Sequence, residues 1–151
     1  MLSASRNQEG LTDREIERCR QTWDFLGGNG CCILDTSEAA RPGSRTRFSQ
    51  TQFVVYLGAD VIPGVGMSAR SRMSEVACLT HELAHAERFR MGIDRTIDRP
   101  DVFLDEAEAS LHASFSKSLG FTDRLTLVED ARSQIAEWQA ETSAGEVENE
   151  N

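Results

Sequence analysis

The sequence predicts an α+β protein that is rich in helices and contains a small mixed sheet. Several segments carry apolar residues at spacings of three and four, as helices do, and two short segments are rich in β-branched and aromatic residues, as strands are. Stretches with glycine and proline separate these segments. In this chain of 151 residues we expect one domain over residues 1–142, followed by an acidic, disordered tail over 143–151.

The first predicted helix begins after Thr12. Thr12 and Glu15 form a capping box, in which each side chain accepts a hydrogen bond from the other residue's backbone N–H. The run of glycines from Gly27 ends this helix. We expect a short strand at 31–34 and then a polar loop over 36–46.

The second predicted strand covers residues 52–57, which are rich in β-branched and aromatic side chains. Residues 58–71 contain three glycines and a proline, and we expect them to form a flexible connection. A helix of roughly 17 residues follows, with Ser74 as its N-cap and Gly92 as its C-terminal stop.

Two more helices are expected, over residues 101–119 and near 126–141. No stretch approaches the roughly 18 continuous apolar residues of a membrane span. The first ten residues lack the apolar core of a classical secretory signal. We therefore expect a cytoplasmic protein that does not contact a membrane.

The most specific pattern in the chain is His-Glu-x-x-His, formed by His81, Glu82 and His85. Four residues apart on a helix, the two histidines lie on the same face. Two neutral imidazoles in that arrangement bind one Zn²⁺, and the glutamate beside them is placed to act as a general base. The chain has three histidines, so this pattern uses two of them.

A catalytic zinc ion usually has three protein ligands, and the helix over 101–119 offers three carboxylates for the third position. These are Asp105, Glu106 and Glu108. Glu108 falls close to the centre of an apolar stripe, whereas Glu106 lies in line with a row of small residues that would let this helix approach the His-Glu-x-x-His helix. Periodicity alone leaves the choice open. The apolar stripe consists of Leu104, Ala107, Leu111 and Phe115, and the small row of Ala109, Ser110 and Ala113.

The spacing from the His-Glu-x-x-His pattern to Glu106 resembles that of the glutamate-type zincins, the gluzincin branch of metallopeptidases. Within that branch, Glu106-Ala107-Glu108-Ala109-Ser110, with Ala113 beyond, is similar to the glutamate helix of ImmA/IrrE-type peptidases. The resemblance implies a minimal zincin-like domain, with the sheet beside the metal-binding helix and an edge strand that holds extended substrate. It also implies that Glu106 is the third zinc ligand. The sequence departs from the pattern at Ser110, where an acid or amide is often found, and at Glu87, where an apolar residue is preferred.

These residues predict zinc-dependent hydrolysis of peptide bonds in a specific protein target. Zinc held by His81, His85 and Glu106 would polarise the scissile carbonyl, and Glu82 would take the proton of the attacking water. His112 and Tyr56 are candidates for stabilising the oxyanion. We expect other roles for both, with His112 as a structural residue or a partner of a metal ligand, and Tyr56 as a packing residue of the sheet. Two alternatives stay open: a metal-stabilised interaction module without catalysis, and a zinc hydrolase that acts on another bond. An intact Glu82 counts against the first.

The net charge of −9 argues against general binding of nucleic acids, which favours concentrated positive charge. The arginines form groups, and we interpret them first as a solvated surface with exposed ion pairs. The alternative is a cationic rim near the site that selects acidic substrate segments. The four cysteines match no zinc-binding spacing, and we expect reduced thiols. Cys78, one turn before His81, is expected to pack in the core.

Overall fold

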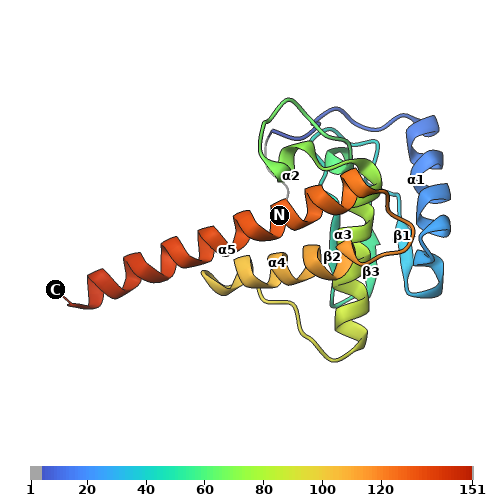
Figure 1. Ribbon diagram of the computed structural model, residues 1–151. Helices are drawn as coiled ribbons and strands as arrows, with labels where there is room; N and C mark the ends of the chain where they lie inside the picture. Colours follow the sequence, from blue (N-terminus) through green and yellow to red (C-terminus); the bar gives the residue numbers. More distant parts are fainter. Residues whose placement is uncertain (1–4, 151) are drawn as a thin grey trace.

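The computed structural model describes residues 5–150 and has an α+β fold with one small sheet and several helices (Figure 1). The α-helices are α1 (Asp13–Phe25), α2 (Ala69–Arg72), α3 (Glu75–Arg90), α4 (Asp101–Ser114) and α5 (Phe121–Glu150). The strands are β1 (Ile33–Asp35), β2 (Arg47–Ser49) and β3 (Val54–Tyr56). Two 3₁₀ turns, η1 (Gly28–Gly30) and η2 (Ala59–Val61), complete the order. The predicted helix-rich class with a small mixed sheet is confirmed.

The sheet has the strand order β1-β3-β2, with β3 in the centre. β1 runs parallel to β3, with Ile33 opposite Val54, and β2 runs antiparallel to it, with Phe48 opposite Val55. β2 is an edge strand. The backbone N–H of Phe48 donates to Glu82 of α3, 3.0 Å away, so the free edge of β2 faces α3.

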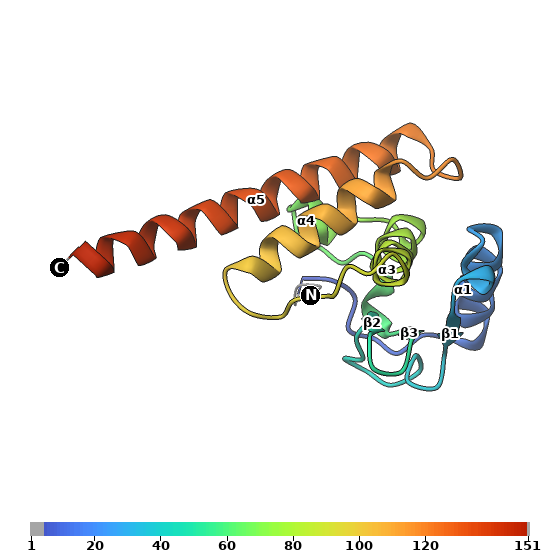
Figure 2. The same cartoon turned by 90° about the horizontal axis from the view of Figure 1, so that it is seen from below.

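Helix α3 lies in the middle of the molecule. Figure 2 looks along it and shows the sheet on one side and the α4–α5 pair on the other. Helices α4 and α5 run antiparallel side by side, and α5 extends well beyond the start of α4 (Figures 1 and 2). Because α3 is covered from both sides, ten of its residues from Ala77 to Ala86 are buried. Large side chains from other parts of the chain belong to the same core, among them Trp23, Val55, Leu57, Met73 and Leu127.

The predicted helix boundaries are confirmed where a cap defines them. Thr12 and Glu15 make both hydrogen bonds of the capping box at α1. The side chain of Ser74 accepts from the N–H of Ala77 at the start of α3. Gly92, just beyond α3, has φ of +90°, a left-handed conformation that glycine adopts without strain.

Four regions differ from the sequence prediction. β2 lies directly after the expected polar loop, where no strand was predicted, and α2 forms one turn inside the expected flexible connection at 58–71. Helix α4 ends at Ser114 rather than near 119. The expected disordered tail is helical over 143–150, and its last residue lies outside the described residues. No proline interrupts α5, and its distal part is rich in alanine and glutamate, which favour helix.

All four cysteines are free thiols, as expected. Cys78 is fully buried in the core, and burial raises the pKa of its thiol to about 12, so the thiol stays protonated near neutral pH. Among the described residues, no helix combines the length and apolar character needed to cross a membrane.

A buried arginine ties the N-terminal segment to the middle of the chain. The guanidinium of Arg6, 2% exposed, donates to backbone carbonyls of η2 and of the segment around α2. Its acceptors include the carbonyls of Val61 at 2.7 Å, Arg70 at 2.9 Å and Met73 at 2.7 Å. These bonds fix the short α2 helix, which has little stability of its own.

Replacing Arg6 by methionine removes this charge and keeps much of the side-chain volume. We expect the free energy of unfolding to fall by about 2–5 kcal/mol, since each buried carbonyl left without a donor costs about 1–3 kcal/mol. Urea unfolding measures the loss. Arg14→Met, at an exposed position of α1, is the control and should change stability by less than about 0.5 kcal/mol. An equal loss in both variants would contradict the role of Arg6.

Candidate metal centre

Helix α3 places both histidines of the His-Glu-x-x-His pattern in the interior. His81 and His85 are 2% and 3% exposed, and their ring centroids lie 4.8 Å apart with the planes at 87°. The rings come from successive turns of one helix face, as the spacing of four requires. Burial lowers the pKa of His85, which favours the neutral imidazole that a metal ion requires.

Glu106 of α4 lies close to both rings. Its Oε2 lies 2.9 Å from Nε2 of His81, and its Oε1 lies 3.3 Å from Nε2 of His85. One ligand atom from each of the three residues falls within 4.8 Å of the other two. The structure therefore brings together the three residues that the sequence analysis selected as metal ligands.

The other two candidates for the third ligand lie elsewhere. The side chain of Glu108 is 60% exposed and pairs with Arg88 at 2.5 Å. Asp105 is buried behind the cluster, with its Oδ2 3.8 Å from Nδ1 of His85 and without a hydrogen bond. Asp105 therefore lies on the side of the His85 ring that faces away from Glu106.

The apolar stripe predicted for α4 is wrong as a guide to its buried face. Phe115 is 81% exposed and Leu111 is 38% exposed, whereas Glu106, Ser110 and the alanines beside them are buried. The small side chains allow α4 to approach α3 closely. Burial of Glu106 is possible because its carboxylate has charged partners inside the protein.

Two arginines hold the carboxylate of Glu106 from the other side. Arg70 of α2 donates to Oε2 at 3.0 Å, and Arg95, from the loop between α3 and α4, donates to Oε1 at 2.9 Å. These two guanidinium groups stabilise the charged form of the carboxylate. The carboxylate is therefore ionised at neutral pH.

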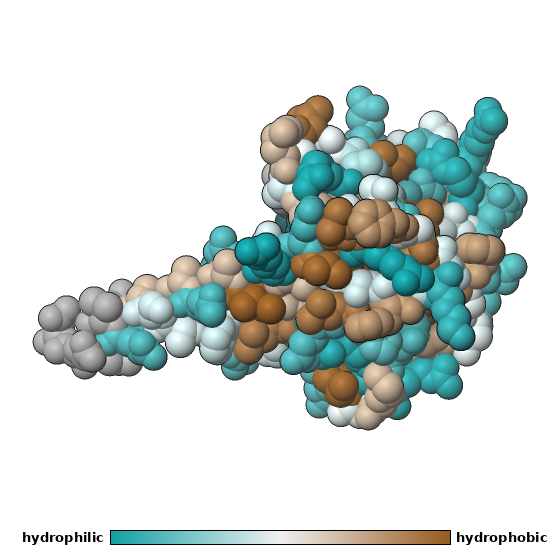
Figure 3. All heavy atoms as spheres, in the orientation of Figure 1, coloured by the Kyte–Doolittle hydropathy of each residue, from teal (hydrophilic) through white to brown (hydrophobic). Residues whose placement is uncertain are grey.

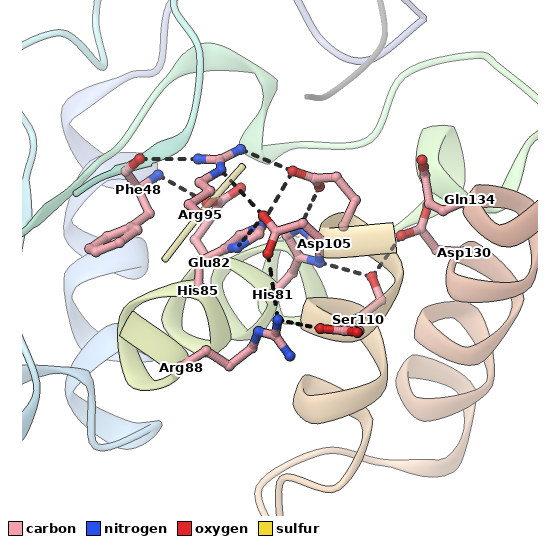
Figure 4. Close-up of polar contacts among 12 residues, drawn as sticks. Phe48, His81, Glu82, His85, Arg88, Arg95, Asp105, Ser110, Asp130 and Gln134 are labelled. Carbon is pink, nitrogen blue, oxygen red and sulfur yellow. Dashed lines mark hydrogen bonds and ion pairs between the residues drawn. The ribbon is translucent and has the colours of Figure 1, made fainter. Parts of the chain in front are cut away.

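The interpretation of the arginines as a solvated surface with exposed ion pairs is confirmed for Arg41, Arg47, Arg72 and Arg99. It is wrong for Arg70, Arg88 and Arg95. Arg70 and Arg88 are 9% and 8% exposed. Arg88 lies 3.5 Å from Asp105 in addition to its pair with Glu108. Arg88 and Arg95 point toward the carboxylate of Asp105 (Figure 4), so they pair inside the protein and do not form the cationic rim that was the alternative interpretation. The acidic residues on α4 could have indicated that some arginines are buried, because buried carboxylates require positively charged partners.

Ser110 and Asp130 connect the metal cluster to α5, and the sequence analysis did not identify Asp130. The hydroxyl of Ser110 lies 2.8 Å from Nδ1 of His81 and donates to Oδ2 of Asp130 at 2.6 Å. Asp130 also accepts two hydrogen bonds from Arg70, at 3.0 and 2.9 Å. Its position next to Leu127 and Ala131 was a usable signal, because an acid on a buried helix face needs a partner.

The proton positions in this series of hydrogen bonds determine which ring nitrogen of His81 has an available lone pair. Burial alone would raise the pKa of Asp130, but its bonds with Arg70 outweigh burial and lower it, so Asp130 is ionised and only accepts. Ser110 therefore gives its one proton to Asp130 and accepts from Nδ1–H of His81. In the neutral imidazole Nε2 then has a lone pair, which faces the lone pairs of Glu106. A cation between these two groups resolves the conflict.

Glu82 lies beside the cluster without belonging to it. Its carboxylate is 4% exposed and accepts a hydrogen bond from the backbone N–H of Phe48. Within residues 5–150 no ion pair to an arginine, lysine or histidine involves Glu82, in contrast to Glu106. Burial raises the pKa of Glu82, which makes its carboxylate a better proton acceptor.

His112 and Tyr56 do not join the cluster. His112 is partly exposed and its Nε2 lies 3.2 Å from Glu87 on another part of α3. The hydroxyl of Tyr56 bonds to Gln52, and the guanidinium of Arg47 lies over its ring, 4.4 Å from the centroid. Neither residue is placed to support a ligand of the cluster.

The arrangement combines three ligand atoms suited to a divalent metal ion with a separate buried carboxylate suited to proton transfer. Comparisons with protein-family models, with curated proteins and with solved structures found no match.

Glu106 and Glu108 offer a direct test of the third ligand. Glu106→Gln should weaken zinc binding by more than about 100-fold, beyond the 10–100-fold that is typical for loss of an outer partner. Glu108→Gln makes the same chemical change at an exposed position, and this variant should bind zinc like the wild type. Competition with a chelating dye measures both. Loss of zinc in Glu108→Gln alone would show that Glu106 is the wrong ligand.

Proposed function

We propose that the protein is a zinc-dependent metallopeptidase in which His81, His85 and Glu106 hold the ion. The observation that carries this proposal is the convergence of three buried ligand atoms within 4.8 Å of one another. Two imidazoles and one carboxylate form the donor set of several catalytic zinc sites. Such a site leaves a coordination position for water or substrate.

The environment of the three residues fits a metal ion. Nε2 of His85 is buried and has no hydrogen-bond partner, and Nε2 of His81 presents a lone pair toward Glu106. Both nitrogens can therefore donate a lone pair to a metal ion in the space that they share with the carboxylate. Zinc bound there supplies Lewis-acid chemistry, which polarises a carbonyl group and makes water more acidic.

Glu82 is the general base in this proposal. Its carboxylate takes a proton from the attacking water and passes it to the departing amine. The hydrogen bond from Phe48 fixes the position of the carboxylate, and its burial raises its pKa. No arginine of the described residues forms an ion pair with Glu82, and this matters because a bound guanidinium would lower the proton affinity of its carboxylate.

The free edge of β2 supports a peptide as the substrate. Phe48 directs its backbone N–H toward Glu82 and its carbonyl toward Arg95, which donates to it at 3.1 Å. An extended peptide that replaces these two contacts and pairs with this edge would therefore lie beside the general base. The resemblance to gluzincin and ImmA/IrrE-type peptidases points to the same substrate class.

Glu82→Gln separates catalysis from metal binding. The amide keeps the size of the side chain but cannot accept the proton, so hydrolysis should fall by roughly 10²–10⁴-fold, the usual contribution of a general base. Zinc content and thermal stability should stay near those of the wild type. Glu87→Gln, on the same helix but paired with His112, is the matched control and should keep full activity.

The substrate assay is proteomic identification of new protein termini in a cell extract incubated with each purified protein. Termini that appear with the wild type and with Glu87→Gln, but not with Glu82→Gln, would support the peptidase. The same termini with all three proteins, or none with any, would contradict it. Retained zinc without new termini would favour a metal-stabilised interaction module.

A further inference from the structure

We infer that Ser110 and Asp130 position His81 for metal binding by forcing its ring proton onto Nδ1. This inference rests on the proposed metal site. It assigns a role in that site to α5, which supplies no ligand. It also gives a role to the serine four residues after Glu106, at the position where the peptidases that the sequence resembles often have an acid or amide.

The contacts form one continuous chain. Nδ1 of His81 lies 2.8 Å from the hydroxyl of Ser110, and this hydroxyl lies 2.6 Å from Oδ2 of Asp130. Ser110 is 0% exposed and Asp130 is 1% exposed, so water does not compete for these bonds. A hydroxyl group has one proton, and the ionised Asp130 claims it. His81 must then be the donor to Ser110.

Arg70 fixes the direction of this chain. It binds both carboxylate oxygens of Asp130 and also Oε2 of Glu106. The guanidinium only donates, so it keeps Asp130 in its ionised, accepting form. Gln134 adds a bond to the same carboxylate at 3.4 Å. The serine thus carries the effect of a distant carboxylate to the imidazole.

The consequence for the metal site concerns Nε2, the other ring nitrogen of His81. With its proton on Nδ1, neutral His81 offers the lone pair of Nε2 toward Glu106. Without an acceptor at Nδ1, the proton would move to Nε2, where the carboxylate of Glu106 accepts it. An incoming metal ion would then have to displace that proton. Partners of this kind are typically worth 10–100-fold in metal affinity.

The first test is independent of any metal. In ¹⁵N-labelled, metal-free protein, the imidazole nitrogen shifts report which nitrogen of His81 carries the proton. We expect protonated Nδ1 in the wild type and in Ser114→Ala. In Ser110→Ala we expect Nδ1 to lose its proton to Nε2. Ser114 is the matched control, because it lies one turn further on α4 and bonds only to the carbonyl of Leu111, at 2.6 Å.

The second test is zinc affinity, measured by competition with a chelating dye. Ser110→Ala and Asp130→Asn should each bind zinc about 10–100-fold more weakly than the wild type, and Ser114→Ala should bind like the wild type. Thermal unfolding checks that each variant is folded; if Asp130→Asn unfolds, the comparison of Ser110→Ala with Ser114→Ala decides.

The inferred role of Ser110 and Asp130 is wrong if the wild type carries the His81 proton only on Nε2, or if Ser110→Ala binds zinc as tightly as Ser114→Ala. Failure of the proposed function looks different. If the wild type takes up no zinc, the proposed metal site is wrong. The tautomer of His81 in the metal-free protein then still tests whether Ser110 and Asp130 place its proton on Nδ1.

Discussion

The burial of the Glu106 carboxylate is the constraint on which the rest of the structure depends. At 3% exposure, an ionised carboxylate without partners would cost several kcal/mol. Its partners come from three other segments: His81 and His85 from α3, Arg70 from α2 and Arg95 from the loop before α4. Helix α4 can therefore place a charged face against α3, and the small residues beyond Glu106 allow the close approach that these bonds require.

The same constraint gives the peripheral elements their roles. α2 is a single turn, yet it carries Arg70, which binds both Glu106 and Asp130. Arg6 binds the carbonyl of Arg70 within this turn and that of Met73 directly after it, so it contributes to the cluster through α2. Through Asp130, α5 is fastened to the centre of the molecule. Glu82 differs from Glu106 and Asp130, because it accepts a hydrogen bond from a backbone N–H whereas those two carboxylates pair with arginines. That difference suits it to exchange protons while Glu106 stays ionised.

Local patterns in the sequence were sufficient for part of this arrangement. The caps at Thr12 and Ser74 and the stop at Gly92 act within one helical turn, and the spacing of His81 and His85 is fixed by the helix itself. The choice of Glu106 needed the family resemblance, because the helix pattern alone favoured Glu108 equally. Contacts between distant segments could not be predicted from local patterns, and Arg70 and Asp130, for example, are 60 residues apart. Strand β2 could not be predicted either, because its three residues are too few to show alternation. Exposed Leu111 and Phe115 misled the analysis of α4, since charge pairing decided which face is buried.

The central claim is that two imidazoles and one carboxylate bind zinc in the interior of this fold. X-ray absorption at the zinc edge, on protein purified with its metal, tests the claim most directly. We expect a nearest shell of nitrogen and oxygen atoms at about 2.0–2.1 Å, with the outer-shell scattering of two imidazole rings. A shell that contains sulfur at about 2.3 Å would assign the metal to the cysteines instead. That result, or purified protein without zinc, would contradict the account.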